Sequence, residues 1–127
     1  MQIQISEAPN LLIVVCRGAF DADTVIATMR EHIPRLGQPD ALWDFSDSDL
    51  STMSPDDFGR ISQAGMELAD LNSPVPPRTA MITGGTYEAM VLKAFIAKAE
   101  SQNPVLFAIF PDRESAMNWL RPDGTGT

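Results

Sequence analysis

The sequence has few of the residues on which catalysis and metal binding most often depend. Among 127 residues there is one cysteine, Cys16, and one histidine, His32. One cysteine excludes an internal disulfide, and one thiol with one imidazole leaves little from which to build a nucleophilic or a metal site. Cys16 follows directly on the apolar run 11–15. We therefore expect a buried structural thiol, a histidine on a helix surface, no catalytic residue, no metal ligand and no cofactor.

Long apolar runs and an excess of basic residues are also missing. No run approaches the roughly 20 residues that a membrane-spanning helix needs. The start, Met1–Ile5, lacks the basic residues and the apolar centre of a signal peptide. With 17 acidic against 9 basic side chains, the formal net charge is -8, which disfavours nucleic acid and anionic membrane surfaces as partners. These features predict a cytoplasmic protein with no integral membrane segment.

Apolar segments of two kinds alternate along the chain. Short runs rich in β-branched residues predict strands, and longer runs with apolar residues three and four apart predict helices. Strands are expected at 2–6, 11–17, 41–45, 78–83 and 105–110, and helices from 21 to about 34, from 54 to about 68, from 86 to 101 and from 111 to 120. The resulting order, β-β-α-β-α-β-α-β-α, predicts an α/β domain with a five-stranded mixed sheet covered by four helices. We expect a single domain over 1–121 and a disordered tail over 122–127.

A polar loop is expected at 46–53, and Ser54-Pro55 predicts the start of the helix that follows. Phosphate on Ser54 would lie at a helix N-terminus and be stabilised there, so Ser51 and Ser54 are candidate phosphosites. Plain capping of the helix by Ser54 is the alternative interpretation. The aspartates in and around this loop lack the glycine and the terminal glutamate of a calcium loop, which favours solvated surface charges.

The segment 86–101 predicts a helix that is apolar on nearly every side. One face is formed by Tyr87, Met90, Val91, Ala94 and Phe95. Leu92 and Ile96 project from another side, and an outer helix of a layered domain cannot bury both faces against its own chain. We therefore expect Leu92 and Ile96 to contact a second copy, a protein partner or a small apolar ligand. The alternative is a sheet-packing helix with a few harmless exposed apolar residues.

Several segments resemble the STAS family, and within it the small stand-alone SpoIIAA-like proteins. They are the apolar strand ending in Arg17-Gly18, the strand Ala-Leu-Trp-Asp-Phe at 41–45, the strand at 78–83 and the closing segment 110–120. The resemblance implies non-enzymatic work: switching between protein partners, interaction domains in transporters, or apolar-ligand binding. Members that act as phosphoswitches carry Asp-Ser-Ser-Gly where this chain has Thr-Met-Ser-Pro at 52–55, so the aspartate and the glycine are missing.

Two functions follow from these observations, and an enzyme is the weakest third. The first is a regulatory or scaffolding module that binds a protein partner or forms a homodimer. The second is a carrier or sensor of a small apolar, lipid-like molecule, held in a pocket under the helix 86–101 to which Met81, Met90 and Phe95 contribute. The candidate interaction or ligand residues are Tyr87, Leu92, Phe95 and Ile96.

Overall fold

A computed structural model of the protein describes residues 1–69, 75–101 and 105–122. The described part contains five strands and four helices in the order that the sequence predicts. The strands are β1 (Gln2–Ala8), β2 (Leu11–Ala19), β3 (Asp40–Asp49), β4 (Arg78–Ile82) and β5 (Leu106–Phe110). The helices are α1 (Ala22–Leu36), α2 (Pro55–Leu68), α3 (Thr86–Glu100) and α4 (Arg113–Leu120). Most of the expected tail, 123–127, lies outside the described residues.

The strands form one mixed sheet in chain order, β1-β2-β3-β4-β5. β1 and β2 make the expected antiparallel hairpin, and β2 to β5 run parallel to one another. A helix connects each parallel strand to the next, as parallel neighbours require. Because the described parallel strands never reverse their order, this sheet has no switch point of the kind where open α/β sheets usually bind ligands.

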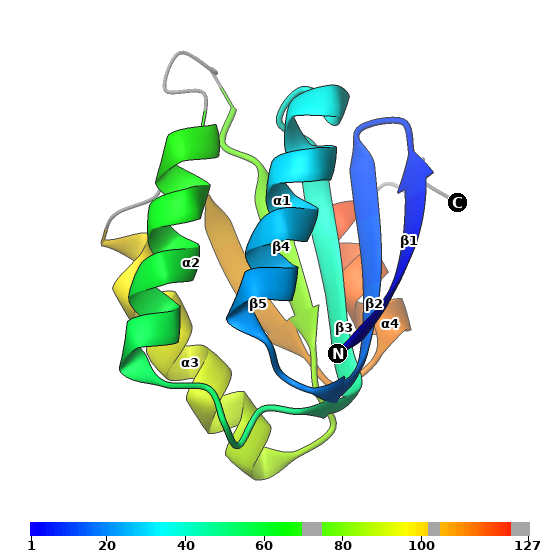
Figure 1. Ribbon diagram of the computed structural model, residues 1–127. Helices are drawn as coiled ribbons and strands as arrows, with labels where there is room; N and C mark the ends of the chain where they lie inside the picture. Colours follow the sequence, from blue (N-terminus) through cyan, green and yellow to red (C-terminus); the bar gives the residue numbers. More distant parts are fainter. Residues whose placement is uncertain (70–74, 102–104, 123–127) are drawn as a thin grey trace.

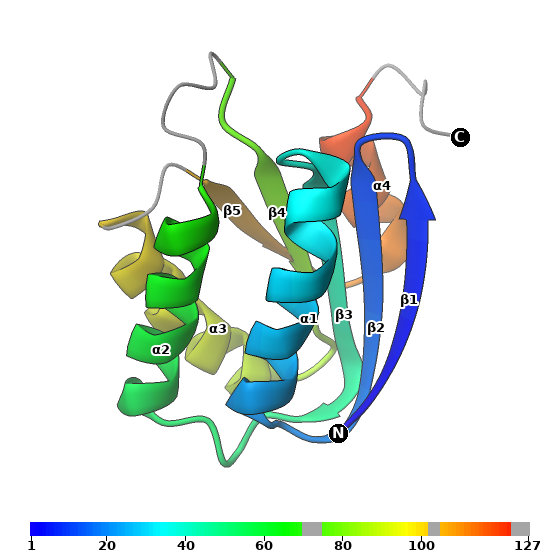
Figure 2. The same cartoon turned by 45° about the horizontal axis from the view of Figure 1, so that its top comes forward.

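Helices cover both faces of the sheet, with α1, α2 and α3 on one face and α4 on the other (Figures 1 and 2). α1, α2 and α3 share the larger core with the side chains of Leu12, Val14 and Trp43. α4 shares a smaller core with alternate residues of the same strands, such as Leu42 and Ala80. Successive side chains of a strand point to opposite faces, and both faces here are apolar. This explains why the strands appear in the sequence as continuous apolar runs.

The prediction of a polar loop over 46–53 is wrong for its first half. β3 continues to Asp49, and its last residues pair with the end of β2, Ser48 opposite Gly18. The pairing shifts register between Val15 and Arg17, where two residues of β3, Phe45 and Ser46, lie opposite Cys16 alone, which indicates a bulge in β3. Polar residues suit this extension because their side chains are largely exposed, although Ser48 is buried and its hydroxyl donates to the Gly18 carbonyl. The segment 46–49 contains only polar residues, so a search for apolar runs did not predict it as part of the strand.

An ion pair between Asp40 and Arg121 connects the ends of several strands and helices at the edge of the sheet where β3 and β4 begin. One carboxylate oxygen of Asp40 accepts from the Arg78 backbone N–H at 2.8 Å, and the other accepts from Arg121 at 2.8 Å. Arg121 also donates to the Asn10 carbonyl in the β1–β2 turn, 3.1 Å away. The side chains of Asp40 and Arg121 are only 17% and 14% exposed. This pair therefore connects the hairpin, β3, β4 and the end of α4.

Candidate functional site

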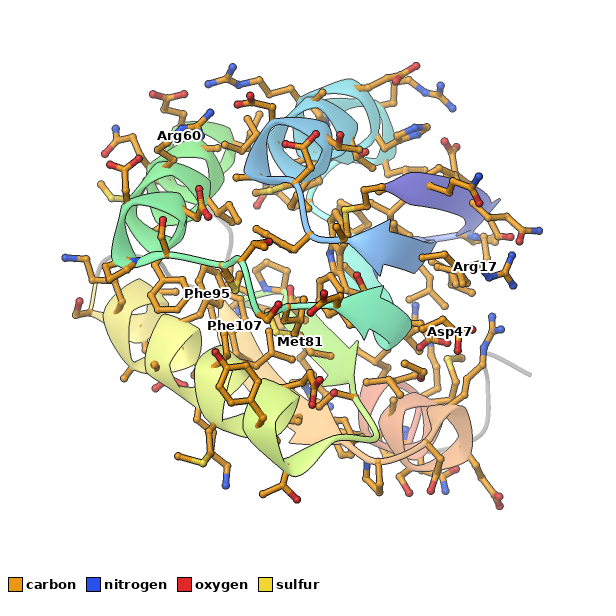
Figure 3. The ribbon with its side chains drawn as sticks, turned by 60° about the horizontal axis from the view of Figure 1, so that its bottom comes forward. Arg17, Asp47, Arg60, Met81, Phe95 and Phe107 are labelled. Carbon is orange, nitrogen blue, oxygen red and sulfur yellow. The ribbon has the colours of Figure 1, made fainter. Side chains whose placement is uncertain are left out.

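An apolar cavity that is partly open to solvent lies in the larger core, between the sheet and the helices α1, α2 and α3. Its volume is about 100 Å³. Side chains of β3, β4 and β5 form its floor, among them Trp43, Met81 and Phe107. Leu92 and Phe95 of α3 form part of its wall. Figure 3 shows Met81, Phe95 and Phe107 gathered between α3 and the sheet, and the rings of Phe95 and Phe107 meet edge to face at 5.9 Å.

The cavity exists because α2 packs mainly against its neighbouring helices. α2 lies against α1 and α3, whereas those two helices contact strands at the two sides of the sheet. α2 still contributes Ile61 and Leu68 to the lining, so its apolar face looks into the space below it. A space that the surrounding side chains do not fill therefore remains under the middle helix.

Three methionines make the wall of this cavity adaptable. Met29 comes from α1, Met53 from the segment before α2, and Met81 from β4. Methionine is unbranched and has three rotatable bonds, so it can change shape around a guest at little cost. The cavity can therefore accept molecules somewhat larger than its resting volume.

Among the described residues the lining is almost wholly apolar, with Gln38 and Thr79 as its polar side chains and no charged one. Both belong to the end of the cavity where β3 and β4 begin, because Gln38 lies two residues before the first residue of β3 and Thr79 pairs with Ala41. The Gln38 backbone has a positive φ of 62°, and its side-chain amide donates to the Leu68 carbonyl at the end of α2. Sequence reasoning missed both residues, since an isolated Gln or Thr carries no motif.

The structure separates the four residues that the sequence proposed on α3. Leu92 is 1% exposed and lines the cavity with Phe95, so the expectation that Leu92 projects outward is wrong. Ile96 is half-buried against the larger core. Tyr87, expected on one apolar face together with Phe95, is 56% exposed, whereas Phe95 is buried. The helix buries the face of Leu92, Phe95 and Ala99, because these positions are the ones directed at the sheet and α2.

The opposite face of α3 carries apolar side chains that its own chain does not cover. The prediction that Met90 contributes to the cavity is wrong, because its side chain is 65% exposed and does not line the cavity. Tyr87, Met90, Ala94 and Ala97 are all exposed, and their spacing places them on one stripe of the helix. The apolar excess predicted for this helix is therefore present, but on the face opposite to Leu92.

Cys16 is a buried structural thiol, as the sequence predicts. It is fully buried in the larger core. Burial raises the pKa of its thiol to about 12, and the negative charge of Asp44 adds to the effect. A thiol that stays protonated at neutral pH is a poor nucleophile and a poor metal ligand.

The side chain of His32 in α1 contacts Glu7, which Arg35 also contacts, and it forms no pair with Cys16. Its Nδ1 lies 2.7 Å from a carboxylate oxygen of Glu7, and Arg35 donates to the same carboxylate at 2.7 Å. The hydrogen bond from His32 holds the pKa of Glu7 below its usual value, and Arg35 acts in the same direction. The cluster fixes the end of β1 against α1, with the His32 side chain mostly covered.

The acidic and hydroxyl side chains near α2 serve local structure. Ser54 and Asp57 form a reciprocal capping box, with the Asp57 N–H donating to the Ser54 hydroxyl at 3.2 Å. Asp49 accepts from the Ser51 backbone N–H, and hydrogen bonding by the Ser51 side chain, with that of its backbone, lowers the pKa of Asp49. Ser51 is exposed and Ser54 is half-buried. Among residues 1–69, 75–101 and 105–122, no three histidines, cysteines or carboxylates gather as a metal site would require.

Comparisons with known proteins give no family. No protein-family model matches the sequence. No curated protein matches it either, so the resemblance to STAS proteins stays a prediction. No helix of the described part is both long enough and apolar enough to cross a membrane.

Proposed function

We propose that the protein binds a small apolar molecule in the cavity under α2, as a carrier or a sensor. The observation that carries the proposal is an apolar space of about 100 Å³ inside the core, with a wall of methionine and aromatic side chains. Close packing normally leaves few voids larger than a water molecule in a protein interior. Side chains around an unfilled apolar space lack packing partners on one side, and a guest that fills the space supplies these contacts.

The volume limits the size of the guest. An engineered apolar cavity of about 150 Å³ binds benzene or xenon, whereas sites for drug-sized ligands occupy roughly 300–1,000 Å³. The cavity, at about 100 Å³, is closer to the first class. We therefore infer a guest the size of one aromatic ring or a short alkyl chain, which the three methionines accommodate by changing rotamer.

Toluene is a suitable probe, and the methionine methyl groups report where it binds. In protein labelled with ¹³C at the methionine methyls, we expect saturable shifts for Met29, Met53 and Met81, which line the cavity. Met66 and Met90 are exposed and should not shift. We expect a dissociation constant of about 1 mM or lower, because every buried carbon of so small a guest contributes to affinity.

A matched pair of alanine variants locates the site. Ala41 of β3 lines the cavity, and Ala41→Val should weaken toluene binding about tenfold by filling part of the space. Ala108 of β5 pairs with Ala80, which belongs to the core on the α4 side. Ala108→Val makes the same change away from the cavity and should leave binding unchanged. Equal shifts of all methionines in the wild type, or none, would show that toluene does not enter the cavity.

We propose self-association through α3 as a second function, which the exposed stripe on this helix favours. The stripe begins with two large side chains, Tyr87 and Met90, and ends with two small ones, Ala94 and Ala97. The pairs 87 and 97, and 90 and 94, have the same midpoint along the helix. When two copies of α3 pack antiparallel, Tyr87 therefore lies over Ala97 of the second copy and Met90 over its Ala94. A two-fold interface requires this kind of self-complementary surface.

The interface would be small, and the two copies would repel each other electrostatically. Four side chains cover less area than a stable dimer normally buries, and two chains of net charge -8 repel each other. We expect a weak dimer in sedimentation velocity, and a larger dimer fraction at 0.5 M than at about 0.15 M salt, because salt screens the repulsion. Met90→Glu should be monomeric, whereas Met66→Glu, on the exposed face of α2, should behave as wild type. A wild type that stays monomeric at millimolar concentration would exclude this function.

A further inference from the structure

We propose that the guest of the cavity is an uncharged molecule with one hydrogen-bonding group, and that the Thr79 hydroxyl receives this group. The proposal rests on ligand binding in the cavity and adds the chemical class and the orientation of the ligand. It follows from three features of the wall: the absence of charge among its described side chains, the position of its polar atoms and the apolar character of the far end.

The wall excludes an ionised guest. None of the described side chains that line the cavity is charged. An ion moved from water into such a space without a counter-charge loses far more hydration energy than the wall can return. Arg78 is the basic residue next to Thr79, and its guanidinium lies on the other side of the sheet, where it donates to the Trp119 carbonyl and stacks 5.5 Å from the Trp119 ring. Fatty carboxylates and organic ammonium ions are therefore poor guests.

The Thr79 hydroxyl is free to bind a guest. Thr79 faces the cavity because it alternates along β4 with Ala80, which belongs to the core on the α4 side. Thr79 is half-buried, and its hydroxyl makes no hydrogen bond with another residue of the described part of the chain. A hydroxyl can donate and accept, so Thr79 can pair with an alcohol, a phenol, a ketone or an amide.

Gln38 places a second polar atom at the same end of the cavity. Its side-chain nitrogen already donates to the Leu68 carbonyl, which leaves its carbonyl oxygen as an acceptor. Away from this end the wall consists of apolar side chains such as Phe20, Phe45 and Met53. The ligand therefore binds with its polar group toward the start of β3 and β4 and its apolar part toward Met53.

Phenol and toluene test the inference because they differ by one hydroxyl in place of a methyl group. For the wild type we expect phenol to bind within about tenfold of toluene, and benzoate not to bind. Thr79→Val keeps the β-branched shape and removes the hydroxyl, so it should weaken phenol about tenfold and leave toluene unchanged. Thr79→Ser keeps the hydroxyl and should retain phenol binding. Methionine methyl shifts measure all three ligands in each variant.

The outcomes separate the inference from the function on which it rests. If toluene does not bind the wild type, both fail. If toluene binds but phenol responds equally to Thr79→Val and Thr79→Ser, or benzoate binds as well as phenol, the ligand-binding function stands and the role of Thr79 is wrong. If Thr79→Val weakens toluene and phenol alike, the hydroxyl does not select the ligand and the inference is overturned.

Discussion

Replacing Leu92 with alanine should lower the free energy of unfolding by about 3 kcal/mol. Leu92 is 1% exposed and lies on the wall of the cavity, so the substitution removes buried methyl groups and enlarges a space that is already empty. The surrounding core can collapse only partly onto such a space, which adds to the lost burial energy. Urea unfolding of the two proteins measures the difference. Saturating toluene should restore part of the lost stability, because a guest that binds the folded state stabilises it.

Met90→Ala on the same helix is the matched control. Met90 is 65% exposed and lies on the opposite face of α3, so its truncation should change stability by less than about 0.5 kcal/mol. Equal losses in the two variants would mean that α3 is rotated relative to the sheet. Leu92→Ala with wild-type stability would mean that Leu92 does not belong to the core.

Asp40→Ala should cost about 3 kcal/mol, although Asp40 has no place in the proposed function. The substitution leaves the Arg121 guanidinium and the Arg78 backbone N–H without their acceptor in a mostly buried position. A buried charge that loses its partner is far more costly than an exposed one. Thermal and urea unfolding should both show the loss, and the hairpin end at Asn10 should exchange its amide protons faster.

The Arg17–Asp47 pair provides the control for this prediction. Its atoms are 3.8 Å apart, and the two side chains are 56% and 71% exposed at the periphery (Figure 3). Exposed pairs contribute about 0–1 kcal/mol, so Asp47→Ala should be nearly neutral. If Asp40→Ala changed stability equally little, the pair with Arg121 would not hold the β1–β2 hairpin, β3, β4 and α4 together as described.

The architecture could be predicted from the sequence because buried strands and helix starts each require particular residues close together in the chain. Strands buried on both faces need continuous apolar runs, such as Leu11–Val15, and helices need caps such as Ser54-Pro55. These two signals predicted the element order and the mixed sheet. The end of β3 was missed because Asp47–Asp49 pairs through its backbone, and backbone pairing leaves no apolar signature.

The orientation of α3 could not be predicted because this helix has too many apolar residues, whereas the end of β3 has too few. Apolar residues occur on all its sides, so periodicity does not distinguish the buried face of Leu92 from the exposed face of Met90. Packing of α3 between β5 and α2 makes that choice. The cavity is also a property of packing, since it depends on how far α2 stands from the sheet. Thr79 gains its role only from that position.

Crystals of the wild-type protein under xenon pressure would test the central claim most directly. Xenon is apolar and fits cavities near this size. We predict one ordered xenon atom between Trp43, Met81 and Phe95, with the surrounding backbone unchanged, and a weaker atom in Ala41→Val crystals. A core closed around these three side chains, with no xenon at pressures that occupy other apolar sites, would contradict the claim that this protein keeps a binding space beneath α2.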